Sequence, residues 1–508
     1  MRDTFRHDVF GVLLVYPDSK KAALGSPGFR EVYRTLSGVR GAVVDWGWYD
    51  EGIDRIEYKC RTWRRRYRCI AVSVPFELLY GNVIRALAAL GVEPEKGNRE
   101  PGGPVVMIGG AAPTINPSVA QVLADIVYIG EIEAHSSDIE NRLSSVEQSG
   151  AASRLTPMIG ITIPMQVNAV PDFISPVDSI GSSMIHGFDE PALCTFENAG
   201  VVEVGRGCSR GCRFCAAGHI YLPARHRDVD AVLRDARTFL GAADRIGLVG
   251  AALSDHGSLK DILRGILDMG FGLTTSSFRA DMIDDELVGL LTDGGLRTLT
   301  IAPEGGSERI RRIINKRLPE ARILEAAEAV SRSGIRNLRL YYMVGLPWER
   351  QADIDDVVAL TAKIRSIFRG PGRTIVVSVN PFIPKPQTPF QWCGMAKTDY
   401  LEKTYWVLKR AFQAMPGVGF KVMSIRAAVR EAVISLGNED VGYALIDSVR
   451  DGIPWKKALV RRGVNVDRLV HREKTPDERF PWDDISGETK KAALLATFEK
   501  AKWTAQEE

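Results

Sequence analysis

The sequence contains no apolar run that approaches the roughly 20 residues a membrane-spanning helix requires. The first residues, MRDTFRHDVFG, lack the apolar stretch of a secretory signal peptide. Acidic and basic residues nearly balance, and a formal net charge of +3 is too small to indicate a nucleic-acid partner by itself. From these absences we expect a cytoplasmic protein without a membrane span.

Cysteine is also scarce, with seven residues in 508, and three of the seven lie within eight consecutive positions. This distribution disfavours a disulfide framework and predicts reduced thiols. Hydrophobic residues at 45% and charged residues at 25% are typical of a globular protein. The length suffices for two or three domains, and no internal repeat or low-complexity tract is present.

Apolar runs alternate with helical periodicity through residues 1–132. We expect strands at 10–16, 42–46, 69–74, 104–110 and 125–131, and helices at 28–39 and 76–92. Continuous β-branched runs separated by helices favour an α/β fold, here a doubly wound, Rossmann-like domain with a parallel sheet covered on both faces. Ligands of such sheets bind at the carboxyl ends of the strands, which places Ser73, Gly109 and Gly110 at the expected rim.

A second alternation begins at residue 199 and continues to 395. Six strands, each followed by a helix, predict a partial (β/α)6 barrel whose chemistry takes place at the carboxyl ends of the strands. Residues 133–198, which contain a polar helix at 138–148 and then several small residues and prolines, are interpreted as a linker. Residues 396–508 are expected to form a mostly helical C-terminal domain.

The stretch GRGCSRGCRFCAAG (205–218) follows the first barrel strand and brings Cys208, Cys212 and Cys215 together. Three interpretations remain open from the spacing alone. A structural zinc site would take His219 as its fourth ligand. An electron-transfer cluster would need a fourth cysteine, and Cys194, 14 residues upstream, is the nearest. The third interpretation is a [4Fe–4S] cluster that leaves one iron free for a substrate-like ligand.

The segment CSRGCRFC resembles the Cys-x3-Cys-x-aromatic-Cys motif of the radical S-adenosylmethionine (SAM) superfamily, with Phe214 as the aromatic residue. The blocks SSFRAD, TIAPEGGSERIRRIINK, LYYMVGLPWE and PFIPKPQTPFQW resemble a branch that joins a cobalamin-binding-like domain to a radical SAM barrel, a relative of the tRNA methylthiotransferases. SVPFELLYGNV, MIGGAAPTINP, YIGEIE and FPWDDI resemble the same branch, so the likeness spans nearly the whole chain.

This resemblance implies a radical SAM enzyme in which Cys208, Cys212 and Cys215 ligate one [4Fe–4S] cluster. In the superfamily the amino and carboxylate groups of SAM chelate the open iron, and an electron from the cluster cleaves SAM to methionine and a 5′-deoxyadenosyl radical. A fourth protein thiolate would block the cofactor. The enzyme would need an electron donor of the flavodoxin or ferredoxin type, while its substrate stays open.

The resemblance also implies residues that bind SAM. GAALSDHG (250–257) stands where the superfamily has Gly-Gly-Glu, and because those letters are absent, Ser254 and Asp255 are only candidates. Ser277 and Arg279, in SSFRAD, match positions that face the ribose and carboxylate of SAM, and an arginine can hold a carboxylate bidentately. The alternative for each side chain is ordinary polar packing at the barrel rim.

Two further positions follow from the same likeness. Glu304, in APEGG, aligns with an acidic residue near the methionyl or ribose part of SAM. Val344 and Gly345, in MVGLP, resemble the fifth-strand motif that contacts adenine through backbone and apolar atoms. The residues His219, Tyr221 and Arg225 are expected to line the same cavity, and PKPQTPFQW (384–392) is interpreted as either a wall of that cavity or a stiff connection.

The resemblance also raises cobalamin as a cofactor of the N-terminal domain. Many cobalamin domains have Asp-x-His-x-x-Gly after the first strand, and here Asp18 is present but Lys20 occupies the histidine position. A lysine ammonium is a poor cobalt ligand at neutral pH. Ser73 and the pair Gly109-Gly110 resemble later cobalamin signatures. Two interpretations remain: cobalamin bound without a protein lower ligand, which favours methyl transfer to an unactivated carbon, or a vestigial scaffold that docks on the barrel.

The run KCRTWRRRYRC (59–69) is the densest charge cluster, and its arginines and aromatic residues are typical of single-stranded RNA binders, although a solvated face is the commoner outcome. RNA modification without cobalamin, of the sulfur-insertion type, is therefore kept as an alternative. A non-catalytic, zinc-stabilised nucleic-acid-binding protein is kept as another, because His219 could complete a zinc site.

Overall fold

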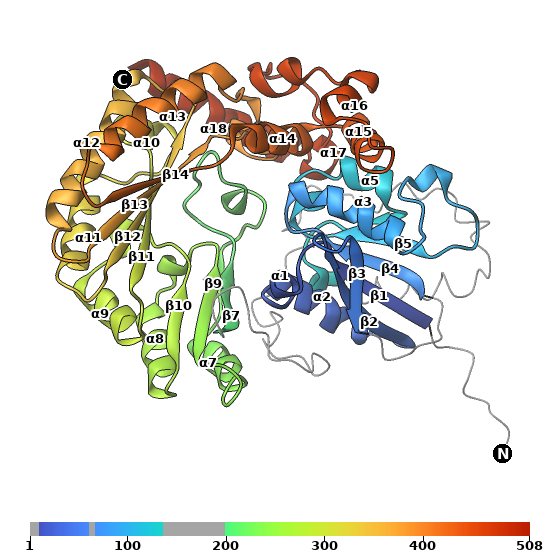
Figure 1. The fold of residues 1–508 in the computed structure, drawn as a ribbon, viewed down its shortest axis with the longest axis horizontal. Helices are drawn as coiled ribbons and strands as arrows, with labels where there is room; N and C mark the ends of the chain where they lie inside the picture. Colours follow the sequence, from blue (N-terminus) through green and yellow to red (C-terminus); the bar gives the residue numbers. More distant parts are fainter. Residues whose placement is uncertain (1–9, 60–66, 136–198, 508) are drawn as a thin grey trace.

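The computed structural model describes residues 10–59, 67–135 and 199–507. The predicted polar helix at 138–148, most of the predicted linker and residues 60–66 of the basic run lie outside these ranges. The described chain forms an α/β layer at its N-terminal side, a curved sheet with outer helices, and a group of C-terminal helices lying across both (Figure 1). Within the described ranges, no helix has the length and apolar character needed to cross a lipid bilayer.

The N-terminal sheet has six strands in the order β3-β2-β1-β4-β5-β6. Their bounds are β1 (Phe10–Tyr16), β2 (Ala42–Asp50), β3 (Arg55–Lys59), β4 (Tyr67–Ser73), β5 (Val105–Gly109) and β6 (Ile126–Val127). All neighbouring pairs are parallel except β2 and β3, which are antiparallel. The predicted parallel sheet is confirmed, with an antiparallel edge strand that the sequence did not indicate.

Helices cover both faces of this sheet because successive side chains of a strand point to opposite sides. Val12 and Leu14 of β1 pack with α2 (Pro27–Ser37), whereas Leu13 and Val15 pack with α3 (Tyr80–Ala89) and α5 (Ser118–Leu123). All seven β1 side chains are buried, which explains the continuous apolar run FGVLLVY. From β1 the sheet extends through β2 and β3 toward one edge, and through β4, β5 and β6 toward the other edge. The strand order therefore reverses between β1 and β4, which opens a crevice at the carboxyl ends of these two strands.

The predicted barrel strands are all present. They are β7 (Ala199–Arg206), β9 (Arg245–Gly250), β10 (Gly272–Thr275), β11 (Thr298–Glu304), β12 (Asn337–Val344) and β13 (Thr374–Pro381). The intervening helices are α7 (Val229–Arg237), α8 (Leu259–Asp268), α9 (Asp285–Asp293), α10 (Glu308–Ile313), α11 (Glu320–Ser331) and α12 (Gln351–Ile367). One parallel bridge, between Phe278 and Ile301, joins the sheet containing β10 to the sheet containing β11.

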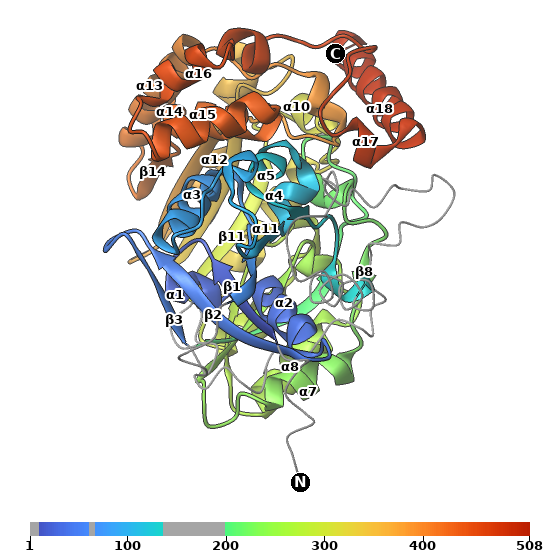
Figure 2. The ribbon, with the colours of Figure 1, turned by 90° about the vertical axis from the view of Figure 1, so that its right-hand side faces the viewer.

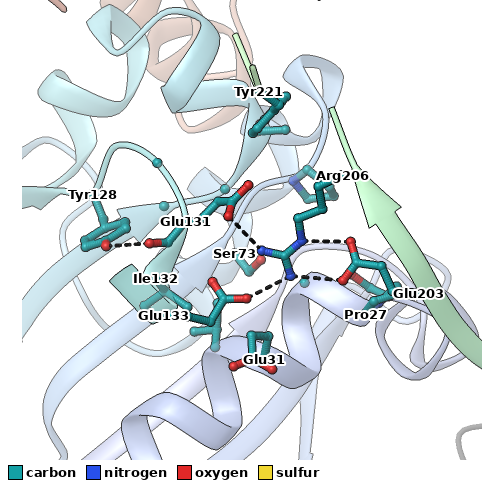
Figure 3. A pocket seen from close by; sticks show the side chains of 18 of the residues that line it. Pro27, Glu31, Ser73, Tyr128, Glu131, Ile132, Glu133, Glu203, Arg206 and Tyr221 are labelled. Carbon is teal, nitrogen blue, oxygen red and sulfur yellow. Dashed lines mark hydrogen bonds and ion pairs between the residues drawn. The ribbon is translucent and has the colours of Figure 1, made fainter. Parts of the chain in front are cut away.

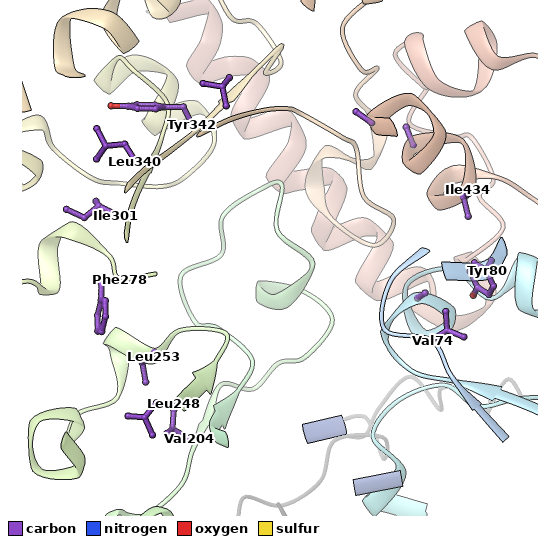
Figure 4. Close-up of a cluster of buried hydrophobic side chains, with 14 of the residues drawn as sticks. Val74, Tyr80, Val204, Leu248, Leu253, Phe278, Ile301, Leu340, Tyr342 and Ile434 are labelled. Atoms are coloured by element: carbon purple, nitrogen blue, oxygen red, sulfur yellow. The ribbon is translucent and has the colours of Figure 1, made fainter. Parts of the chain in front are cut away.

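Every second residue along β12 and β13 is buried. In β12 the buried residues include Leu340, Tyr342 and Val344, each at most 1% exposed. Figure 4 shows Leu340 and Tyr342 in line with Ile301 and Phe278 of neighbouring segments, and Val74 and Tyr80 of the N-terminal domain belong to the same buried cluster. The other side chains of each strand face the barrel interior, where the carboxyl ends can present polar groups.

Two strands besides β3 were not predicted. β8 (Arg225–His226) pairs antiparallel with β7, and β14 (Val418–Val422) pairs parallel with β13 inside the segment expected to be mostly helical. β14 is largely exposed and contains two polar or glycine positions in GFK, so it lacks the apolar run that identifies a buried strand. Its pairing with β13 extends the barrel sheet by one strand.

Helices form the remainder of the C-terminal region, as predicted. They are α13 (Thr398–Gln413), α14 (Ile425–Leu436), α15 (Glu439–Val449), α16 (Trp455–Arg461), α17 (Asp483–Ser486) and α18 (Glu488–Glu507). α15 packs on α3 and α5 of the N-terminal domain, and α18 packs on α10 of the barrel. These helices therefore lie over both other parts of the molecule (Figure 2).

Candidate active site

The three cysteines lie on the loop that leaves the carboxyl end of β7. Gly207 begins this loop with φ +72°, and a Cβ at that position would meet the carbonyl oxygen of Tyr221 at 2.1 Å. Gly211 also has a left-handed backbone, with φ +63°. Glycine adopts such conformations at the lowest energetic cost, because it has no Cβ. The glycines of GRGCSRG are therefore what lets the chain turn tightly enough to present three sulfurs on one short loop.

The loop is held in place by the segment after α10. The Arg213 amide donates to the carbonyl of Ile314 at 3.0 Å, and Asn315 Nδ2 donates to the carbonyl of Gly211 at 2.7 Å. The Arg213 guanidinium donates to the carbonyls of Arg312 and Ile313, at the C-terminal end of α10. A cation there satisfies orphan carbonyls and complements the helix dipole.

All three thiols are free, and burial raises the pKa of Cys212 to about 11. Among the residues that the structure describes, no three His, Cys, Asp or Glu side chains converge as a single metal ion requires. His219, the fourth ligand of the zinc alternative, has its Nε2 3.0 Å from the carbonyl oxygen of Cys212. A [4Fe–4S] cube distributes its thiolates over separate irons and does not need them to converge on one ion. The donor set therefore fits a cluster better than zinc.

The barrel brings three predicted or nearby charged residues close to these thiols. Arg279, which follows β10, and Glu304, the last residue of β11, both act electrostatically on Cys212. Lys316 acts on it more strongly than either, and its Nζ lies 3.3 Å from Glu304 Oε1. Lys316 was missed because one lysine in IINKRLPE, the connection between α10 and α11, has no periodic or spacing signal.

The charged candidates are not free. The Arg279 guanidinium forms a two-pronged bond to Asp281, with both distances 3.0 Å. The Asp255 carboxylate is held in the same way by Arg210, from inside the cysteine loop, at 2.8 and 2.6 Å. Ser254 is buried, and its Oγ accepts a long bond of 3.4 Å from the Arg279 amide. The two arginine–aspartate pairs therefore lie between the cysteine loop and the segments that follow β9 and β10.

Ser277 and the MVGLP motif are placed differently from these charges. Ser277 is exposed, while Val344 is completely buried and its carbonyl accepts the Phe382 amide at 2.8 Å. Gly345 has φ +71°, and its amide donates to Glu349 Oε1 at 2.8 Å. The same oxygen accepts the Tyr400 hydroxyl at 2.6 Å. Burial raises the pKa of Glu349 to about 7.

A cavity of about 480 Å³ lies between the N-terminal sheet and the barrel. Ser73, Gly109 and Gly110 line it from the carboxyl ends of β4 and β5, as predicted for the rim. Ala217 and Tyr221 line it from the segment that follows Cys215. The crevice at the reversal of strand order therefore opens directly toward the cysteine loop.

Carboxylates surround one arginine in this cavity (Figure 3). Arg206, two residues before Cys208, binds Glu203 bidentately at 2.8 and 2.9 Å and lies 2.8 Å from Glu133 and 3.2 Å from Glu131. Glu131 also receives a buried two-pronged bond from the Arg225 guanidinium, so Arg225 lies behind the cavity wall. This network ties the N-terminal domain to the strand that carries the cysteines, and scattered single glutamates gave no sign of it in the sequence.

The other predicted positions lie away from the cavity. The Lys20 ammonium lies 5.4 Å from the centre of the Trp48 ring, and Lys20 is not among the lining residues. Gln387, in PKPQTPFQW, donates to the carbonyls of Thr114 and Ile115 at 2.8 and 2.9 Å. These bonds join the proline-rich segment, which follows the last barrel strand, to the N-terminal domain.

Several known proteins are similar to the chain. The uncharacterized protein MJ0966 of Methanocaldococcus jannaschii is 27% identical over 450 residues, covering 85% of this chain and 90% of that protein. The cobalamin-dependent S-adenosylmethionine radical enzyme OxsB with aqua-cobalamin bound is 16% identical with a TM-score of 0.44, over 70% of this chain and about half, 52%, of that one. With aqua-cobalamin and S-adenosylmethionine bound, OxsB aligns over 98% of this chain and 72% of its own, at 14% identity and a TM-score of 0.47. At these values the structural likenesses carry no information on ligands or reaction.

Two family models match the chain directly. Residues 50–159 match the model described as Radical SAM proteins, N-terminal, and residues 202–361 match that of the Radical SAM superfamily. The second match contains the cysteine loop and the strands β9 to β12 whose ends surround it. The chain therefore belongs to the radical SAM superfamily and is a radical SAM enzyme.

Proposed function

We propose that Cys208, Cys212 and Cys215 ligate one [4Fe–4S] cluster and that the enzyme cleaves SAM reductively to begin radical chemistry on its substrate. When bound, the cluster supplies an open iron for SAM and the electron for cleavage. The observation that carries this proposal is the position of three free thiols on one loop at the carboxyl end of β7, inside the region matched to the superfamily.

The chain's own charges suit the binding of a zwitterionic ligand beside the thiols. We assign Lys316 and Arg279 to the carboxylate of SAM and Glu304 to its methionyl or ribose part. Arg279 and Glu304, which follow or end barrel strands, and Lys316, which follows α10, all act electrostatically on Cys212. A carboxylate next to Arg279 would compete with Asp281 for the same donors. Backbone atoms at Val344 and Gly345 would contact the adenine.

The protein also shields this region from water. Phe214, inside the cysteine motif, packs against a cluster of buried residues that includes Phe390 and Trp392. α18 covers the same cluster with Phe498 and Ala501. Radical intermediates need protection from solvent. This apolar cover on one side of the loop therefore supports a reaction from which water is excluded.

Anaerobic reconstitution with iron and sulfide tests the assignment. The native chain should bind about four irons under the one-cluster ligation proposed here, and should release 5′-deoxyadenosine from SAM after reduction by dithionite. Cys212→Ala should lose cluster and cleavage together. Cys69→Ala, a buried free cysteine in β4, is the matched control and should retain both. Cleavage by Cys212→Ala would refute the ligand assignment.

We further propose that the cavity between the domains holds cobalamin without a protein lower ligand, and that the reaction is then methyl transfer to a carbon. The support is the position of the cavity at the reversal of strand order, with Ser73, Gly109 and Gly110 on one wall and the cysteine loop on the other. Lys20 lies over Trp48 and would leave the lower face of the corrin without a side-chain ligand.

A spectral titration with hydroxocobalamin tests this second proposal. The native protein should shift the corrinoid absorption bands, and Ser73→Phe, which fills the cavity, should weaken binding at least about tenfold. Ser366→Phe, an exposed position on α12, should bind as the native protein does. No spectral change with the native protein would instead favour the scaffold interpretation and leave RNA modification without cobalamin as the alternative.

A further inference from the structure

A second cavity, of about 1230 Å³, lies among the C-terminal helices. None of its lining residues lines the cavity between the N-terminal sheet and the barrel. Two helices, α14 and α16, form its apolar wall, with the side chains of Ile425, Val429, Val433, Trp455, Leu459 and Val460. The three residues from α14 are spaced four apart, so they lie on one face of that helix. Val460 is 76% exposed, and solvent therefore reaches this wall.

Three arginines meet at the same place. Arg426 and Arg430 of α14 line the cavity. A Cβ built on Gly81 of α3 would lie 3.8 Å from Arg85 Nη1 and 3.9 Å from Arg430 Nη2, so both guanidinium groups reach the same glycine. Burial, Arg85 and Arg426 lower the pKa of Arg430, in that order, and Glu51 raises it less. The cations therefore lie close enough to repel one another.

The positive charge of Arg430 is poorly compensated. Within the described part of the chain, no carboxylate forms an ion pair with Arg426 or Arg430. Asp399 and Glu402 of α13 also line the cavity and pair with neither. The Arg430 guanidinium lies 5.4 Å from the centre of the Trp455 ring, and its Nε is buried without a hydrogen-bond acceptor. Because a buried N–H without an acceptor is costly, a ligand that supplies one is favoured.

The first turn of α14 adds to this positive charge. It contains Arg426 and no acidic residue, although Ser424 caps the helix by accepting the Ala427 amide at 3.4 Å. The N-terminus of a helix has a partial positive charge, so a cation there is unfavourable by itself and an anion is favourable. The position of Arg426 therefore suits an anionic ligand.

We propose that this second cavity binds a small phosphate ester, with its phosphate on Arg85, Arg426 and Arg430 and its apolar body against the wall formed by α14 and α16. Guanidinium groups bind phosphate oxygens in pairs. A phosphate monoester carries a charge of about −1.5 to −2 near pH 7, which matches several cations better than a single carboxylate does. The site is independent of the proposed radical chemistry, because it uses no residue of the cysteine loop or of the first cavity.

Isothermal titration calorimetry of the full-length protein tests the site with phenyl phosphate, benzoate and inorganic phosphate as probes. Phenyl phosphate should bind at least about tenfold more tightly than either of the others, because only this probe combines a doubly charged phosphate with an apolar ring. Arg426→Gln and Arg430→Gln should each weaken phenyl phosphate binding about tenfold, since each loses a charged hydrogen-bond donor.

Arg461→Gln is the matched control, because Arg461 is 62% exposed on α16 and does not line the cavity. It should bind phenyl phosphate as the native protein does. Arg426 is exposed, so Arg426→Gln should keep the native melting temperature and tests the site even where Arg430→Gln unfolds. Native affinity in Arg426→Gln, or equal affinity for benzoate and phenyl phosphate, would overturn the proposal. Binding of single-stranded RNA without binding of phenyl phosphate would overturn it too.

Discussion

At the scale of single residues, left-handed backbone gathers around the candidate site. Glu304, Asn315 and Arg317 have φ values of +68°, +56° and +47°, and Trp348 follows MVGLP with +57°. Such conformations cost on the order of 1–3 kcal/mol each in residues other than glycine and persist where surrounding contacts enforce them. Glu304 ends β11 after a register shift, which turns its carboxylate toward Lys316. Backbone strain is therefore concentrated where charged side chains of the candidate site must be oriented.

Glu349 gives a prediction at this scale. Burial raises its pKa to about 7, so the folded protein binds a proton more tightly than the unfolded chain. The ionised carboxylate therefore costs stability, and the cost grows as pH rises from the ordinary glutamate range to about 7. Relative to the native protein, Glu349→Gln should gain melting temperature between pH 5 and pH 8, by the equivalent of about 3 kcal/mol.

Tyr400 and Asp353 are the other titratable groups acting on Glu349. Burial raises the pKa of Tyr400, so its hydroxyl stays protonated in that pH window. Thermal unfolding of both proteins at the two pH values measures the difference. An unchanged difference would show that Glu349 does not titrate there.

At the scale of elements, three glycines of β7 and its loop lie where a side chain would not fit. Gly200, Gly205 and Gly207 each sit where a Cβ would meet another atom within 2.4 Å. The neighbours are the Phe239 ring, the Arg225 carbonyl and the Tyr221 carbonyl. Close approach of β8 and the segment after Cys215 to β7 therefore depends on glycine, and the position of the cysteine loop depends on that approach.

Gly207→Ala tests this dependence. The new Cβ would collide with backbone and push the loop from its position, so iron incorporation on reconstitution should fall by at least half. Gly241→Ala is the matched control, because Gly241 has φ +76° but no atom within 4 Å of an added Cβ. It should lose about 1 kcal/mol through backbone strain and keep its iron. Full iron content in Gly207→Ala would show that the loop adapts without cost.

At the scale of the whole molecule, a buried ion cluster joins the three parts of the chain. Lys385, in PKPQTPFQW, lies 2.7 Å from Glu77 of the N-terminal domain and 2.8 Å from Glu431 of α14. Both carboxylates are less than 10% exposed. Gln387 adds bonds to the N-terminal domain and accepts one from Lys490 of α18. One short segment therefore contacts the N-terminal domain, α14 and α18 at once.

Lys385→Met should loosen this joint strongly. It leaves two buried carboxylates without their cation, and breaking a buried pair costs about 3–5 kcal/mol. The variant should melt at a lower temperature and become sensitive to limited proteolysis. Adding Glu77→Gln and Glu431→Gln should restore much of the loss, because the uncompensated charge is removed. Lys397→Met, whose ion pair with Asp467 is exposed, should cost less than about 1 kcal/mol. Equal effects of the two lysine substitutions would contradict the role of burial.

Sequence alone predicted most of the regular elements. Every barrel strand and its following helix is confirmed, because each is a buried apolar run or an amphipathic period that needs no partner to be recognised. β14 was missed because an exposed strand of mixed polarity has no such period. The short β8 exists only through its pairing with β7.

The order of neighbouring residues along the chain determined the cysteine spacing and the glycines that flank it. It therefore also determined the class of enzyme, because a tight ligand loop is built from consecutive residues. Only the folded chain decided which distant charges meet there: Lys316 beside Glu304, Arg210 on Asp255, and the carboxylates around Arg206. These pairings join positions separated by up to 75 residues. An ion pair produces no periodic pattern in the sequence around either of its residues. The physical reason is that a buried charge without a partner is costly, so buried charges are paired with whichever opposite charge the packing places next to them. Their distance along the chain does not matter.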